Sequence, residues 1–115
     1  MGVDVSHQEV RVVQVTGEID FSNVEGMSQE VDRAVEESPA GFILDLTGAE
    51  YIDSAVISVV IRAYRRLCPE GRLALAVRPG PIAHIVSLIH PERLPGMIVC
   101  PDVASAERAI REGRD

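Results

Sequence analysis

The sequence predicts an α/β fold, a small mixed but mostly parallel sheet of four to five strands with about four helices. Two observations carry this prediction. Short apolar runs rich in β-branched residues alternate with segments of helical periodicity from residue 10 onward, and turns rich in Pro or Gly separate most of them. A length of 115 residues suits one domain spanning residues 1–115. Because right-handed crossovers join parallel strands, the loops after the strands should converge on one edge of the sheet.

The first third of the chain predicts a hairpin followed by a helix. Residues 3–7 alternate weakly and suit a short edge strand, and residues 10–16 (VRVVQVT) form a stronger strand. Residues 17–20 are expected to leave the sheet. The Ser22-x-x-Glu25 pattern matches a capping box and predicts a helix start. The apolar stripe of this helix recurs at spacings of three and four: Val24, Met27, Val31, Ala34 and Val35.

The centre of the chain predicts a buried strand, a loop and a helix. Residues 42–46 (FILDL) are mostly apolar, as in a strand covered on both faces, and residues 47–50 (TGAE) should end it. Residues 55–67 contain no Gly or Pro and form a helix closed by Pro69, with Asp53 and Ser54 at its first turn. Taken alone, Ser54 is as well explained as a helix N-cap as it is as a functional hydroxyl.

The last third of the chain again predicts strands that alternate with helices. Residues 72–77 predict a strand, and the turn Pro79-Gly80-Pro81 predicts the start of a short helix, because Pro is favoured at the first helical position. That helix stops at Pro91. Residues 97–100 predict a last strand, and Pro101-Asp102 predicts the cap of a final helix through Ile110.

The amino-acid composition indicates which classes of partner and which cellular compartment suit this chain. The net charge of −7 disfavours nucleic acid and anionic membrane surfaces as partners. The first nine residues are polar, and no apolar run approaches the roughly 20 residues of a membrane-spanning helix. Cys68 and Cys100 lie far apart and form no CxxC pair, which favours free thiols in a reducing compartment over a disulfide. These features predict a cytoplasmic protein.

The sequence offers no catalytic or metal-binding motif. It lacks a nucleophile elbow, a phosphate-binding loop and a dinucleotide fingerprint, so we expect no enzyme activity and no cofactor. A pairing of His84 with Ser87 lacks a positioned carboxylate and is better explained as a surface feature. Asp20, Asp45 and Asp53 could meet at one edge and hold Mg²⁺, but turn and cap roles explain Asp20 and Asp53 without a metal.

Two segments resemble the signature of the STAS domain family: residues 44–54 (LDLTGAEYIDS) and, upstream, residues 15–20 (VTGEID). This family contains the bacterial anti-sigma factor antagonists and the cytoplasmic tails of sulfate transporters. In the sporulation and stress-response antagonists, an anti-sigma factor that is also a serine kinase phosphorylates the Ser of the Asp-Ser pair. The resemblance therefore implies that Ser54 is phosphorylated, that the unphosphorylated chain binds the anti-sigma factor, and that sigma-dependent transcription is regulated in this way.

One departure from the family pattern keeps an alternative open. Val56 stands where the family usually has Gly, which favours a STAS interaction module without a phosphorylation cycle, such as a scaffold subunit or a soluble transporter-associated component. The first two turns of the central helix are apolar nearly all round, so Ile57 and Ile61 are expected to be exposed toward a partner. The predicted partner-binding residues are Asp20, Asp53, Ser54, Ala55, Val56, Ile57, Ile61, Pro79 and Gly80.

Overall fold

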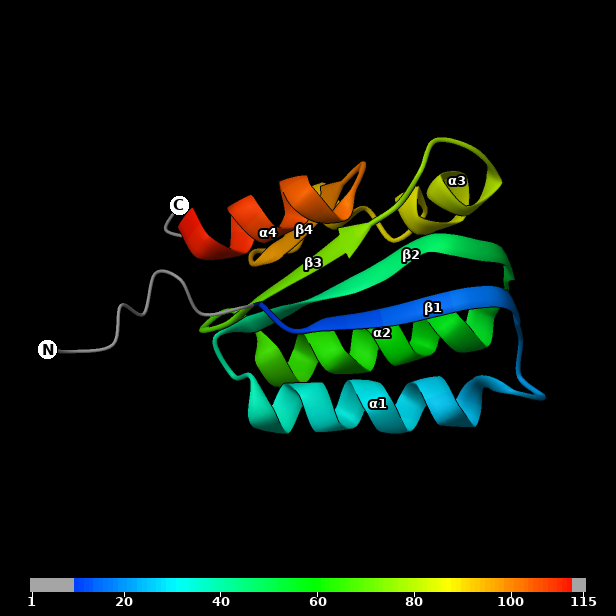
Figure 1. The fold of residues 1–115 in the computed structure, drawn as a ribbon, viewed down its shortest axis with the longest axis horizontal. Helices are drawn as coiled ribbons and strands as arrows, with labels where there is room; N and C mark the ends of the chain where they lie inside the picture. Colours follow the sequence, from blue (N-terminus) through cyan, green and yellow to red (C-terminus); the bar gives the residue numbers. More distant parts are fainter. Residues whose placement is uncertain (1–9, 113–115) are drawn as a thin grey trace, which may run out of the picture.

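Four parallel strands form the centre of the computed structural model, which describes residues 10–112 (Figure 1). Helices cover both faces of this sheet. In chain order the elements are β1 (Val12–Ile19), α1 (Val24–Glu37), β2 (Gly41–Ile52), α2 (Ser54–Leu67), β3 (Arg72–Ala76), α3 (Pro81–Ser87), the 3₁₀ helix η2 (Pro91–Arg93), β4 (Met97–Cys100) and α4 (Val103–Glu112).

The strand order β1-β2-β3-β4 follows the sequence, and every pairing within residues 10–112 is parallel. The connections between neighbouring strands all contain helices and have the same handedness, so α1, α2 and α3 contribute to one hydrophobic core. The last helix, α4, covers the opposite face of the sheet (Figure 1). The predicted α/β class is therefore confirmed. The strand predicted at residues 3–7, which made the expected sheet mixed, lies outside the described residues.

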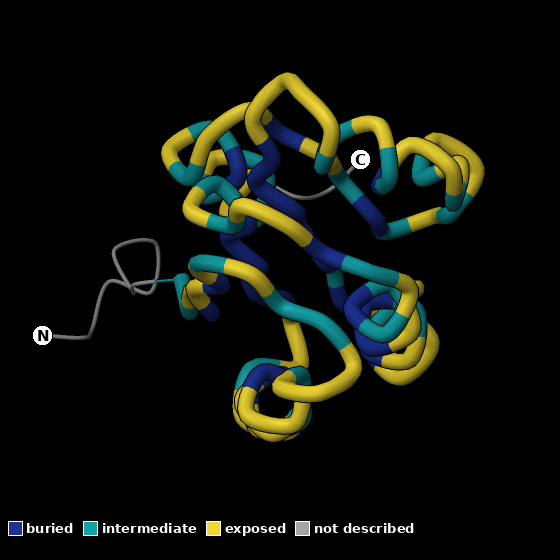
Figure 2. Tube along the Cα trace, turned by 90° about the vertical axis from the view of Figure 1, so that its right-hand side faces the viewer, coloured by how far each residue is buried: buried dark blue, intermediate teal, exposed yellow. Residues whose placement is uncertain are grey.

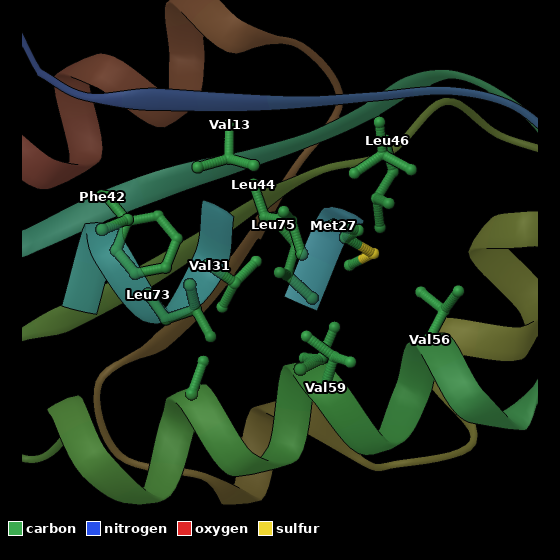
Figure 3. Close-up of a cluster of buried hydrophobic side chains, with 14 of the residues drawn as sticks. Val13, Met27, Val31, Phe42, Leu44, Leu46, Val56, Val59, Leu73 and Leu75 are labelled. Carbon is green, nitrogen blue, oxygen red and sulfur yellow. The ribbon is translucent and has the colours of Figure 1, made fainter. Parts of the chain in front are cut away.

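Alternation along the central strands separates the two faces of the sheet. Phe42 and Leu44 join the core beneath α1 and α2 (Figure 3). Ile43 packs on the side of α4. On β3, the residues facing α4 are Ala74 and Ala76, both fully buried, so this helix can approach the sheet closely. Figure 2 shows the same arrangement from the end, with the sheet-facing sides of α1 and α2 buried and their outer sides exposed.

Strands β1 and β2 are longer than the sequence predicted. Residues 17–20 were expected to leave the sheet, but β1 continues to Ile19, which pairs with Ile52. Residues 47–50 were expected to end the second strand, but β2 also continues to Ile52. Gly17 makes the extension possible because its φ of +76° accommodates a shift in register between β1 and β2. Both predictions of an early strand end were wrong.

The start of α1 also differs from the prediction. Its N-cap is Asn23, one residue after Ser22, and no side chain caps the helix. The Ser22 hydroxyl donates to Asp20 instead, so it does not reach the helix backbone. The predicted capping box is therefore wrong, although the helix itself and its buried stripe of Met27, Val31, Ala34 and Val35 are confirmed.

The C-terminal elements agree with the sequence. β3 and β4 occupy the predicted segments, and α3 has Pro81 at its first position. Asp102 Oδ1 accepts a hydrogen bond from Ser105 N at 2.7 Å and caps α4 as predicted. Cys68 and Cys100 are free thiols. Among residues 10–112, no helix has the length and apolar character needed to cross a membrane.

Candidate functional site

The carboxyl ends of β1 and β2 hold the Asp-Ser pair against the loop that precedes α1. Asp53 follows β2, and its Oδ2 accepts a hydrogen bond from Phe21 N at 3.1 Å across 32 residues of sequence. At the same end of the molecule, Pro79 and Gly80 form the loop between β3 and α3 and line a shallow cavity with Thr47 and Glu50 of β2 (Figure 1). The loops predicted to converge therefore do meet at this edge of the sheet.

Ser54 is the first residue of α2 and is exposed. The N-cap is Asp53, whose Oδ1 accepts from Ala55 N at 2.9 Å, so the interpretation of Ser54 as the cap is wrong. Within the described part of the chain, the Ser54 hydroxyl has no hydrogen-bond partner. A carboxylate that satisfies the helix end thus leaves the neighbouring hydroxyl available to another molecule.

Asp20 organises the loop between β1 and α1. Its Oδ1 accepts from Ser22 Oγ at 2.6 Å and from Ser22 N at 2.9 Å, and its own N–H donates to Asn23 Oδ1 at 2.9 Å. The Ser22 hydroxyl, followed by the Ser22 amide, lowers the pKa of Asp20, since both donors stabilise the carboxylate. Asn23 Nδ2 also donates to Glu18 O at 2.9 Å, which ties the loop back to β1.

Two aromatic side chains on this edge were not predicted from the sequence. Phe21 is 81% exposed at the tip of the loop, and Tyr51, near the end of β2, is 51% exposed. The available signal was the composition of the turn. Phe21 lies between Asp20 and Ser22, polar neighbours that are typical of a surface turn.

Val56 is fully buried, so its side chain offers no surface to a partner. It points from α2 toward the sheet, near Leu46, within the main core (Figure 3). The expectation that Val56 forms part of the partner-binding surface is corrected accordingly. Residues two positions apart on an α-helix point in nearly opposite directions, so Val56 faces inward while Ser54 faces solvent. Ala55 lies between these two extremes and is half-buried.

Ile57 and Ile61 were expected to be exposed, but both are half-buried. Ile57 packs in part against the core, and both isoleucines line a shallow groove on the outer side of α2 with Ser58 and two arginines. One of these arginines, Arg62, donates to Ser28 Oγ at 2.6 Å and to Asp32 at 3.1 Å, joining α2 to α1. A partner-facing role for the two isoleucines stays a prediction.

No cluster of three or more His, Cys, Asp or Glu side chains that could hold a metal ion occurs in the described structure. Asp45 is buried and accepts from Thr47 N and Thr47 Oγ1, so it closes a local turn in β2. Ser87 Oγ donates to the backbone carbonyl of His84, not to its imidazole. The hydroxyl of Ser87 is therefore bound locally and does not form a pair with the His84 side chain.

A family model for the STAS domain matches residues 3–106, most of the chain. The chain belongs to the STAS domain family. No curated protein matches the sequence.

Solved structures share the STAS fold of this chain. An anti-sigma factor antagonist from Mycobacterium paratuberculosis has 24% identity and a TM-score of 0.76, over 87% of this chain and 84% of its own. The anti-sigma factor antagonist SpoIIAA in its unphosphorylated form has 20% identity and a TM-score of 0.64, over 90% and 89% of the two chains. An uncharacterized Shewanella loihica protein with a SpoIIAA-like fold has 13% identity and a TM-score of 0.56, over 86% and 82%. At these identities the likeness shows the fold.

Proposed function

We propose that this STAS domain is an anti-sigma factor antagonist, which binds an anti-sigma factor with serine kinase activity and is switched off by phosphorylation of Ser54. The unphosphorylated chain sequesters the anti-sigma factor and so releases a sigma factor. The kinase chemistry belongs to the partner, and this chain supplies the substrate hydroxyl. Such a cycle would operate in the cytoplasm, where the free thiols Cys68 and Cys100 would stay reduced.

The exposed, unbonded hydroxyl of Ser54 is the observation that carries the proposal. A kinase requires a hydroxyl that can be reached without unfolding the chain. Because Asp53 caps α2, modification of Ser54 removes no hydrogen bond from the helix. The family membership and the likeness to two proteins described as anti-sigma factor antagonists support the same role.

Electrostatics explains how one phosphate could end binding without disturbing the fold. A phosphoserine carries about −1.5 to −2 charges, and a helix N-terminus tolerates an anion. A kinase that modifies Ser54 must hold a nucleotide phosphate against it. After transfer, the new phosphate, the Asp53 carboxylate and the remaining nucleotide are all negative and face one another in the complex. This repulsion favours release of the product.

A phosphate-transfer assay tests the proposal directly. The cognate anti-sigma factor and ATP are mixed with the wild-type chain, and incorporation of phosphate is followed by intact mass and peptide mapping. We expect one phosphate, located on Ser54, and none in Ser54→Ala. Ser58→Ala is the matched control, because Ser58 is also an exposed serine of α2, one turn later, and this variant should be labelled as fast as wild type. Label that persists in Ser54→Ala would contradict the proposal.

The alternative of an interaction module without phosphorylation rested on Val56. Since this side chain is fully buried, the departure from Gly changes the core and not the exposed surface beside Ser54. No observation in the described structure now favours the alternative over the phosphorylation cycle. It would regain support if a Ser54→Asp variant bound the partner as tightly as wild type.

A further inference from the structure

The two phenylalanines of the chain have opposite environments. Phe42 is fully buried in β2, whereas Phe21 is 81% exposed at the tip of the loop between β1 and α1. A large aromatic ring in water contributes nothing to folding, and the described residues leave Phe21 outside the hydrophobic core. Its position next to the Asp-Ser pair gives it a different use.

The loop that carries Phe21 is already ordered in the free protein. Asp20, Ser22 and Asn23 are joined by side-chain and backbone hydrogen bonds on both sides of the ring. The amide of Phe21 itself donates to Asp53 Oδ2, so the ring is fixed relative to the residue that precedes Ser54. An exposed aromatic residue on a pre-organised loop loses little conformational entropy on binding, which is the property of an interface anchor.

The charged side chains of the two segments that carry this ring and the Asp-Ser pair have one sign, and the loop between β3 and α3 adds one basic residue, Arg78, at the same end of the molecule. Within residues 18–25 and 50–54, every charged side chain is acidic: Glu18, Asp20, Glu25, Glu50 and Asp53. A complementary surface would therefore offer an apolar pocket for the ring and basic side chains around the pocket.

We infer that Phe21 is the anchor by which this domain binds its anti-sigma factor, with the ring inserted into an apolar pocket edged by basic residues. The inference rests on the proposed function and adds to it the residue that carries the binding energy. The hydrogen bond to Asp53 explains why the anchor and the phosphorylated hydroxyl would act on one partner. An anchored ring holds Ser54 at a fixed position on the kinase surface.

Measured affinity for the cognate anti-sigma factor tests this role. Because truncation of an interface anchor is costly, Phe21→Ala should weaken binding by about 30-fold or more. Val99→Ala is the matched control, since Val99 is 43% exposed on β4, at the opposite edge of the sheet, and its removal should change affinity by less than about threefold. Phe21→Ala keeps the amide that binds Asp53, so the loop retains its hydrogen bonds.

The outcomes separate the two proposals. Wild-type binding together with unchanged affinity in Phe21→Ala would overturn the anchor and leave the proposed function standing. Failure of the wild-type chain to bind the anti-sigma factor would contradict the proposed function itself, and the anchor with it. Affinity should also fall as salt is added, and an affinity independent of ionic strength would overturn the basic surround of the pocket.

Fluorescence gives an independent test, because the chain contains no Trp. In Phe21→Trp the single indole should emit as a solvent-exposed group in the free protein. On binding, its emission should shift to shorter wavelength and become protected from a soluble quencher, after the spectrum of the wild-type complex is subtracted. An indole that stays solvent-exposed in the bound complex would overturn the inference.

Discussion

At the scale of single residues, Asp53 joins the two halves of the candidate site. One carboxylate oxygen caps α2 through Ala55 N, and the other holds the loop of the preceding crossover through Phe21 N. This double use is what leaves Ser54 exposed and without an internal partner. Asp and Ser are both favoured N-caps, so the sequence alone could not decide which of the two adjacent residues takes the role.

Removing the Asp53 carboxylate should therefore destabilise the fold. We expect Asp53→Ala to lower the free energy of unfolding by about 1 kcal/mol through the lost cap. Urea denaturation of the purified chain measures the change, and exchange of the Phe21 amide should accelerate in parallel. Ser54→Ala serves as the control, since its side chain makes no internal hydrogen bond, and it should stay within about 0.5 kcal/mol of wild type. Equal effects of the two variants would contradict the assignment of the cap.

Asp20 gives a prediction that depends on pH. Hydrogen bonds from Ser22 lower its pKa in the folded state, so the stabilisation they provide is present above the ordinary pKa of an Asp. It is lost as the pH falls through the lowered pKa, where the carboxylate takes up a proton. Titration of the side-chain carboxyl by NMR should place the Asp20 pKa below 3.8, and Ser22→Ala should raise it. A pKa that does not respond to Ser22→Ala would contradict the hydrogen-bond geometry.

The candidate site residues differ in how far the sequence could predict them. Ser54 was indicated by the Asp-Ser pair within a longer signature, and its exposure agrees with that role. Phe21 belongs to no such signature, and its polar neighbours indicate only a surface turn. Its exposure follows from the hydrogen bonds of Asp20 and Asn23, and these form only once the loop has folded.

At the scale of elements, the direction in which a helix position faces decides whether a substitution there changes the surface or the core, and Val56 is an example. A Val in place of the usual Gly could have altered the partner surface or the core. Because α2 packs with Val56, Val59 and Val60 toward the sheet, the change fills the core near Leu46 (Figure 3).

Restoring the family residue should therefore cost stability. Val56→Gly removes a fully buried side chain and adds a helical glycine, and we expect a loss of roughly 2–4 kcal/mol in the free energy of unfolding. Ser58→Gly, at an exposed position of the same helix, carries only the propensity cost of roughly 0.5 kcal/mol. Urea denaturation compares them. Similar losses in the two variants would show that Val56 does not support the core.

Strand ends were the least predictable features of the elements. Gly17 and the TGAE segment have the composition of turns, and on local preference they should have ended β1 and β2. Pairing between the two strands overrides that preference. Shifts in register near Thr16 and Glu18 absorb the irregular backbone, and the ladder continues to Ile19 and Ile52.

At the scale of the whole molecule, the alternation of strands and helices was sufficient to predict the α/β class and the edge at which the loops meet. In a parallel sheet, all carboxyl ends lie at one edge, so the topology alone gathers the residues that follow β1, β2 and β3. The side of the sheet covered by α4 could not be predicted in the same way. It depends on small residues such as Ala74 and Ala76, which are equally compatible with other packing partners.

The central claim is that phosphorylation of Ser54 controls binding to an anti-sigma factor, and one measurement tests it most directly. The wild-type chain is prepared in unphosphorylated and Ser54-phosphorylated forms, and each is titrated against the cognate anti-sigma factor with bound nucleotide. The account predicts tight binding of the unphosphorylated form, a loss of at least about tenfold in affinity on phosphorylation, and circular dichroism spectra of the two forms that do not differ. Equal affinity of the two forms would contradict it.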